Sequence, residues 1–201
     1  MLDAYARRII DPPLDRIGRD LAAAGISANS ITLAGFAVGL LMLPCLALQW
    51  YGAALAAILL NRLADGLDGA VARRTRLTDL GGYLDIVCDF IFYAAVPFGF
   101  ALARPENAVP AAFLVVSFAG TGSSFLAFAI LAAKRNPATE AQGRKSLYYI
   151  GGLTEGTETI ILFVAVCLFP AAFPALAWIF GALCWITTAT RILSARRAFR
   201  A

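Results

Sequence analysis

The stretch NRLADGLDGAVAR, residues 61–73, decides how this chain must fold. It ends an apolar run long enough to cross a membrane, yet it carries Arg62, Asp65, Asp68 and Arg73. Charged groups inside such a run are costly in lipid, so they must face protein partners or a polar cavity. The stretch therefore predicts a helix whose apolar part lies in a bilayer and whose polar end contributes to a site.

A second acidic stretch follows after a short link. Residues 81–89 read GGYLDIVCD and open the next apolar run. Asp65 and Asp68 are three residues apart, so they share one helical face. Asp85 and Asp89 are four apart and share a face for the same reason. Helices joined by a short link lie antiparallel, so we expect the two acidic faces to meet near one surface of the membrane.

Composition extends this interpretation to the whole chain. Of its 201 residues, 60% are hydrophobic and 15% are charged, and the mean hydropathy is +0.75. Soluble domains are roughly 45–50% apolar and about 25% charged. We predict a single all-α integral membrane domain over residues 1–201, with no second domain or internal repeat. The long apolar runs predict six transmembrane helices, at about 30–48, 52–73, 83–103, 109–133, 154–170 and 174–194.

An amphipathic helix over residues 1–25 is expected to precede these spans and to lie in the membrane interface. Pro12-Pro13 should break it into two pieces. Gly25 should end it, and the polar cluster at residues 27–30 can cap the next helix.

Basic residues set the expected orientation. Fifteen of the 17 Lys and Arg fall on the side that holds both chain ends, Arg104 alone falls on the other, and Arg62 lies inside a span. By the positive-inside rule, both ends and the acidic site face the cytoplasm, as expected for a protein of a bacterial inner membrane. The small net charge of +4 suits a surface of anionic lipids and not nucleic acid.

Four carboxylates brought together need neutralisation. At ~4 Å each like-charged pair costs about 4 kcal/mol at an effective dielectric of 20. The chain has no histidine, and its four cysteines lack metal-ligand spacing, so protons or hard cations such as Mg²⁺ or Mn²⁺ are the candidates. Two such ions ~3.5–4 Å apart would suit in-line displacement at phosphorus. Alternatively, the aspartates hydrogen-bond between helices or pair with Arg62, Arg73 and Arg74.

Four glycines flank the acids: Gly66, Gly69, Gly81 and Gly82. They let a nucleotide or phosphate approach the backbone, or they serve helix packing; the sequence leaves both open.

The pattern Asp65-x2-Asp68-Gly69-x2-Ala72-Arg73, then Gly81-x3-Asp85-x3-Asp89, resembles the signature of the CDP-alcohol phosphatidyltransferases. The stretch from Ser27 to Thr32 is also similar to a family motif, with Ala28 in place of its proline. The link from Arg73 to Gly81 is one residue shorter than is usual in the family.

The resemblance implies an enzyme that transfers a phosphatidyl group from a CDP-linked lipid to a small alcohol and releases CMP. It implies that the four aspartates bind two divalent ions, Mg²⁺ or Mn²⁺, and that Asp89 also takes the hydroxyl proton. It further implies that Gly69, Ala72 and Arg73 contact the CDP group. A homodimer is compatible with the sequence.

The acceptor alcohol is less defined. A basic rim suits a phosphorylated polyol such as glycerol 3-phosphate or inositol phosphate, although the positive-inside bias explains the same residues: Lys134, Arg135, Arg144 and Lys145. Glu155 and Glu158 suit polyol hydroxyls or an amine, or they pair with basic groups nearby. Two other classes stay open: a transporter or ion pathway lined by the same carboxylates, and a non-catalytic interaction protein.

Overall fold

The structure, a computed structural model, describes residues 3–135 and 153–199, and these contain helices and no strand. The all-α class is therefore confirmed for the described part of the chain. The elements in chain order are α1 (Asp3–Ala23), α2 (Ala28–Leu40), α3 (Met42–Ala47), α4 (Tyr51–Arg74), α5 (Asp79–Ala103), the 3-10 turn η1 (Pro105–Asn107), α6 (Ala108–Arg135), α7 (Gly156–Leu168), the 3-10 turn η3 (Pro170–Ala172) and α8 (Phe173–Ala198).

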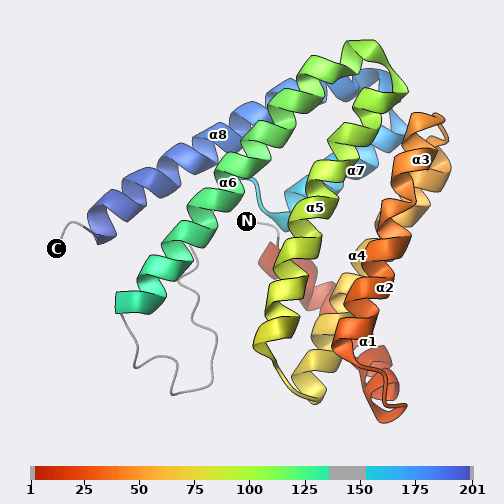
Figure 1. The fold of residues 1–201 in the computed structure, drawn as a ribbon, viewed down its shortest axis with the longest axis vertical. Helices are drawn as coiled ribbons and strands as arrows, with labels where there is room; N and C mark the ends of the chain where they lie inside the picture. Colours follow the sequence, from red (N-terminus) through yellow and green to blue (C-terminus); the bar gives the residue numbers. More distant parts are fainter. Residues whose placement is uncertain (1–2, 136–152, 200–201) are drawn as a thin grey trace.

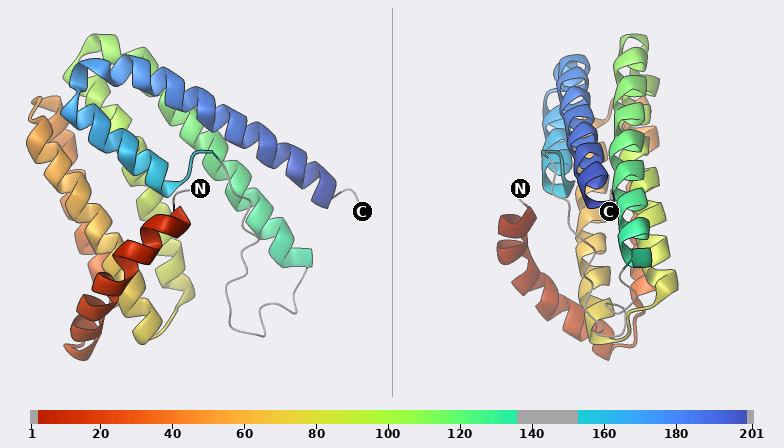
Figure 2. Two further views of the ribbon diagram at one scale, coloured as in Figure 1. Left: turned by 180° about the vertical axis from the view of Figure 1, so that it is seen from behind. Right: turned by 90° about the vertical axis from the view of Figure 1, so that its left-hand side faces the viewer.

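The helices form two groups that meet at one end of the molecule. Figures 1 and 2 show α2, α3 and α4 running together, with α5 beside them, while α6 and α8 run side by side and diverge from that group. The groups join where η1 links α5 to α6 and η3 links α7 to α8. At the opposite end, α1 slants across α4. The polar end of α4 and the start of α5 therefore lie away from the junction.

The hydrophobic core lies toward the junction. Phe100 of α5 stacks on Phe173 of α8, with ring centroids 4.4 Å apart, and Phe92 meets Phe163 of α7 edge to face. Ile58 of α4 is fully buried in the same cluster. Burying a side chain of this size contributes about 1.5–3 kcal/mol. The core thus fixes the position of α4 relative to α5. Its nearest buried residues, Ile58 and Phe92, lie one to two helical turns from the aspartates of these helices.

A helix occurs at each of the six predicted positions. The prediction that all six cross the membrane is not confirmed. Within residues 3–135 and 153–199, four segments are long and apolar enough to cross a membrane: Ala28–Ala47, Asp79–Ala103, Pro105–Arg135 and Pro170–Ala198. The charges of α4 keep it out of this set, and α7 has 13 residues. At 1.5 Å per residue α7 is about 20 Å long, short of a hydrocarbon layer of about 30 Å.

The prediction that Pro12-Pro13 breaks the N-terminal helix is wrong. Both prolines lie inside α1, which is continuous. A proline ring removes one backbone hydrogen bond and pushes on the preceding turn, which bends a helix without necessarily ending it. The curvature of α1 in Figure 2 agrees with this. Its interfacial role stays a prediction, because Leu14 is buried against protein whereas Ile10 and Ile17 are about half exposed.

The predicted helix boundaries around residue 25 are confirmed. Gly25 has φ +77°, and its N–H and that of Ile26 donate to carbonyls of the last turn of α1. A positive φ suits glycine and ends the helix. Ser27 is extended, and its hydroxyl accepts from the N–H of Ser30, which caps α2.

Cysteine labelling can test the path of α6. In a background with the four native cysteines replaced by alanine, Arg104→Cys and Lys134→Cys should react with a membrane-impermeant thiol reagent from opposite sides, because Pro105–Arg135 would separate them by a bilayer. Permeabilised membranes, in which both should react, are the control. Reaction of both positions from one side of intact membranes would contradict this topology.

Candidate active site

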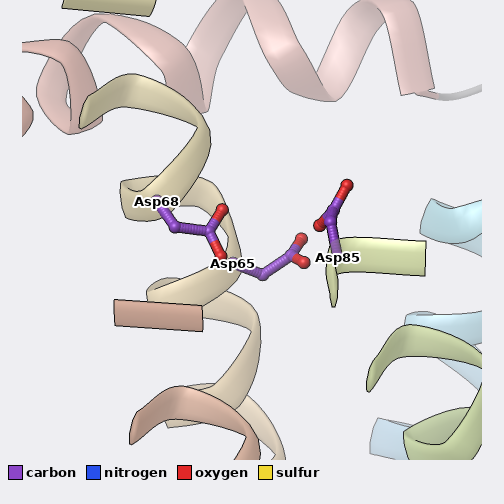
Figure 3. Close-up of side chains that lie close together, drawn as sticks. All are labelled: Asp65, Asp68 and Asp85. Carbon is purple, nitrogen blue, oxygen red and sulfur yellow. The ribbon is translucent and has the colours of Figure 1, made fainter. Parts of the chain in front are cut away.

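Three of the predicted site residues form a compact acidic cluster. Asp65 and Asp68 lie on one face of α4, and Asp85 lies opposite them on α5 (Figure 3). One carboxylate oxygen from each lies within 4.8 Å of the other two. At that distance two full charges repel by about 3.5 kcal/mol at an effective dielectric of 20. Hard divalent cations bind oxygen ligands, and these three carboxylates can supply part of such a coordination shell, so the cluster fits such an ion.

Thr32 connects α2 to this cluster. Its hydroxyl lies 2.5 Å from Oδ2 of Asp68 and donates to it, and Asp68 is buried. A hydrogen bond to a charged group contributes about 1.5–3 kcal/mol. Thr32 therefore orients one carboxylate of the cluster from a third helix.

Asp89 lies in the same pocket but outside the three-residue cluster. Its Oδ1 accepts a hydrogen bond of 2.7 Å from Nη2 of Arg62 on α4. Arg62 also lies 3.7 Å from Asp65, at the limit of an ion pair. The sequence left open that arginines near the site pair with its aspartates. Arg62 does so, whereas Arg73 pairs with Asp15 of α1.

The backbone around Arg62 is held by Asn61. The Asn61 side chain is buried, donates to the carbonyl of Gly35 on α2, and accepts from two nitrogens of Arg62. Gly39 on α2 leaves room for it, because a Cβ there would lie 2.8 Å from the amide nitrogen. A polar chain therefore runs from α2 through α4 to Asp89 on α5.

The glycines divide between the two roles that the sequence left open. Gly66 packs closely against Leu14 of α1, so it serves helix packing. At Gly69 a side chain would meet the guanidinium of Arg73 at 3.3 Å, and at Gly82 it would meet nothing within 4 Å. The surface over Gly82 is thus open to a ligand, whereas the Arg73 side chain lies close over Gly69. Ala72 and Arg73 lie one turn after Gly69 on α4.

A cavity of about 460 Å³ adjoins the aspartates on the side of α6 and α8. Asp85 and Asp89 line it from α5, and Arg191 lines it from α8. Nη1 of Arg191 donates to the carbonyl of Thr121, and the guanidinium lies over the ring of Phe125 at 5.6 Å. The cavity therefore combines carboxylates and a cation next to the acidic cluster.

The residues predicted for the acceptor lie apart from the lining of this cavity, as far as they are described. Lys134 and Arg135 are exposed at the end of α6, and Arg135 donates to the carbonyls of Ala198 and Phe199 after α8. Arg144 and Lys145 lie outside the described residues. The role of these four residues stays a prediction.

Sequence reasoning missed Arg191 and the capping role of Glu158. No local sequence pattern links Arg191 to aspartates more than 100 positions away. The Glu158 carboxylate accepts from the N–H of Glu155, and together they form a capping box at the start of α7. The Glu155-x-x-Glu158 spacing before an apolar run is a signal for such a cap.

Fold and site define a class: a helical membrane protein with carboxylates converging where two helices adjoin. The family model described as CDP-alcohol phosphatidyltransferase matches residues 25–192. The chain therefore belongs to the CDP-alcohol phosphatidyltransferase family and is a membrane transferase of phospholipid biosynthesis. The alternatives of a transporter and of a non-catalytic interaction protein are set aside.

Individual proteins agree with this assignment. The chain is 61% identical to the inner membrane protein YnjF of Escherichia coli, covering 96% of this chain and 95% of that protein. It is 32% identical to the archaetidylinositol phosphate synthase of Pyrococcus horikoshii, covering 94% and 93%. Its fold matches the phosphatidylinositol phosphate synthase PgsA1 of Mycobacterium tuberculosis with CDP-DAG bound, at a TM-score of 0.66 and 23% identity over 91% and 93% of the two chains. The same synthase with manganese and citrate gives a TM-score of 0.64 at 24% identity, covering 89% and 87%.

The crowding of carboxylates predicts a gain in stability when one is neutralised. Asp65→Asn removes repulsion from Asp68 and Asp85 and loses a 3.7 Å contact with Arg62. In detergent with EDTA we expect the melting temperature to rise by about 2–4 °C for each kcal/mol relieved. Asp15→Asn is the matched control, because its exposed ion pair contributes only about 0–1 kcal/mol. A lower melting temperature for Asp65→Asn would contradict this account.

Proposed function

We propose that this enzyme transfers the phosphatidyl group of a CDP-lipid to a small, phosphorylated polyol and releases CMP. One observation carries the proposal: the acidic pocket adjoins a mixed-charge cavity on one side and shares Gly35 with an apolar groove on the other. A water-soluble acceptor and a lipid can thus reach the same carboxylates from opposite directions.

The acidic pocket would hold two divalent ions, Mg²⁺ or Mn²⁺. Asp65, Asp68 and Asp85 offer converging oxygens, and Asp89 lines the same pocket. The manganese complex of the M. tuberculosis synthase supports this assignment. When bound, the ions would neutralise the carboxylates and the charge that develops on the phosphates.

The chain's own residues would perform the proton transfer. The acceptor hydroxyl oxygen forms a bond to the β-phosphorus of the CDP-lipid, and the bond from that phosphorus to the bridging oxygen breaks. CMP leaves with the bridging electron pair, and Asp89 takes the hydroxyl proton. Gly69, Ala72 and Arg73 would contact the CDP group, in keeping with the position of the Arg73 guanidinium beside Gly69.

The apolar groove suits one acyl chain of the CDP-lipid. It is an open groove of about 500 Å³ between α2 and α4, and its lining is almost entirely apolar, with Ile31, Val38 and Leu60 among its residues. CDP-DAG is bound in the M. tuberculosis synthase, which agrees with a diacylglycerol-based donor.

The cavity on the other side suits the acceptor. Arg191 would pair with its phosphate, and Thr121, Thr159 and Glu155 would face its hydroxyls. The matched synthases from P. horikoshii and M. tuberculosis carry inositol phosphate in their names, which favours inositol phosphate over glycerol 3-phosphate. Lys134, Arg135, Arg144 and Lys145 would form an outer basic rim.

We infer that the protein lies in the inner membrane with the site facing the cytoplasm. The E. coli relative is named an inner membrane protein, and the basic residues gather on the side of the aspartates. α4 and α7 would complete six spans.

Release of CMP tests the function. Purified protein with CDP-diacylglycerol and Mn²⁺ should release CMP with inositol phosphate or glycerol 3-phosphate and not with choline or serine. EDTA should abolish the release, and added Mg²⁺ or Mn²⁺ should restore it. Full turnover in EDTA would exclude the metal assignment, and CMP release only with choline or serine would exclude a phosphorylated acceptor.

Two aspartate variants separate binding from proton transfer. Asp89→Asn should bind CDP-lipid nearly normally but lose turnover by at least about 10²-fold, the low end for general acid–base catalysis. Asp68→Asn should weaken metal binding, so excess Mg²⁺ should restore part of the activity of this variant. Excess Mg²⁺ should restore none of the activity of Asp89→Asn. Near-normal turnover of Asp89→Asn would rule it out as the base.

A further inference from the structure

Arg73, near the end of α4, is held by a residue that lies outside the signature. Its Nη2 lies 3.0 Å from Oδ1 of Asp15 on α1 and donates to it. The Arg73 and Asp15 side chains are 48% and 41% exposed, so the ion pair lies at the protein surface. An exposed pair of this kind contributes little to stability. Its place beside the residues proposed to contact the CDP group points to a different role.

The packing of α1 against α4 fixes where Asp15 lies. Leu14 is buried and packs closely against Gly66. One turn further along α1, a Cβ at Gly18 would come within 2.7 Å of the Cβ of Ala70. Glycines at both points let the two helices approach closely along this face (Figure 2). Asp15 follows Leu14 in the chain and is therefore held beside the last turns of α4.

The ion pair also sets the direction of the Arg73 guanidinium. Gly69 precedes Arg73 by one helical turn, so the two residues share a face of α4. A Cβ at Gly69 would lie 3.3 Å from Nη1 of Arg73, whereas Nη2 is the nitrogen that bonds Asp15. One end of the guanidinium is thus anchored to α1, and the other lies over a position without a side chain. A guanidinium carries several N–H donors, so a bond to Asp15 leaves others for a phosphate.

We propose that Asp15 is a positioning residue that holds the Arg73 guanidinium in place for the phosphates of the CDP group. The inference rests on one part of the proposed function, the contact of Arg73 with CDP. An unanchored arginine side chain samples many rotamers at a surface, and ordering it on ligand binding costs free energy. The ion pair orders the side chain beforehand, so less of that cost opposes the binding of CDP.

The sign of the effect separates positioning from plain electrostatics. Asp15 and CDP are both negative, so removing the charge in Asp15→Asn would by itself favour the binding of CDP nearby. Competition between Asp15 and a phosphate for Arg73 would likewise make Asp15→Asn bind CDP more tightly. Positioning predicts the opposite result, weaker binding, because the guanidinium loses its anchor.

The probe for this effect is CDP itself, titrated by calorimetry into full-length protein in detergent with Mn²⁺ present. Arg73→Gln should weaken CDP binding at least about tenfold, because hydrogen bonds from a charged group are lost. Asp15→Asn should weaken it about threefold to tenfold, because the arginine must then be ordered by CDP. In the CMP-release assay the KM of Asp15→Asn for CDP-diacylglycerol should rise by a similar factor, with kcat nearly unchanged.

Two further variants serve as comparisons. Asp15→Glu keeps the carboxylate and should recover most of the CDP affinity, because the longer side chain can still reach the guanidinium. Asp20→Asn is the matched control, because it removes the same charge from an exposed position of α1, and it should change neither CDP binding nor KM. The melting temperature of Asp15→Asn should stay close to that of the wild type, which separates weaker CDP binding from loss of folding.

A double variant assigns the effect to Arg73. In the Arg73→Gln background, Asp15→Asn should not weaken CDP binding further, because no guanidinium is left to position. The inference is overturned, while the proposed reaction stands, if Asp15→Asn binds CDP as tightly as the wild type or more tightly. It is equally overturned if the loss persists in the Arg73→Gln background, or if Arg73→Gln binds CDP normally.

Failure of the proposed function has a different result. In that case the wild type binds CDP but releases no CMP from CDP-diacylglycerol with either phosphorylated polyol. The CDP titrations then decide the role of Asp15 by themselves, because they need no acceptor. Absence of CDP binding by the wild type would overturn both.

Discussion

Mutual repulsion among four carboxylates, held where two largely apolar helices adjoin, constrains the rest of this structure. Asp65, Asp68 and Asp85 converge to within 4.8 Å, and Asp89 lines the same pocket. Nothing in a hydrocarbon layer can solvate them, so protein groups or cations must compensate. The polar chain from the Gly35 carbonyl through Asn61 and Arg62 meets part of this need.

Distant parts of the fold supply the force that keeps these charges together. The aromatic core around Phe92, Phe100 and Phe173 holds α5 against its neighbours, and burial of large aromatic side chains is among the strongest stabilising contributions available. On the other side of the acids, α1 packs its Leu14 against Gly66 of α4. The site is thus strained electrostatically but supported by packing at both ends, as expected where function opposes stability.

The position of the acids at a boundary between two environments has a chemical consequence. A CDP-lipid carries acyl chains that belong in the bilayer and a nucleotide that belongs in water, whereas a polyol phosphate is wholly polar. The groove between α2 and α4 is apolar, and the cavity toward α6 and α8 contains Arg191 and Glu155. The two proposed reactants, a CDP-lipid and a polyol phosphate, would therefore meet at the same carboxylates without either leaving its preferred medium.

Local sequence signals predicted most helices, several of their ends and the acidic residues that converge. Helical spacing assigned Asp65 and Asp68 to one face, and Gly25 and Ser27 marked a helix end and a cap, because these signals depend on neighbours within one turn. Three features became visible only in the folded protein: Arg62 bonds Asp89 in preference to Asp65, α1 bends without breaking, and Arg191 lines a cavity together with Asp85 and Asp89. Periodicity defines which residues share a face, whereas the partner across the gap depends on how whole helices pack.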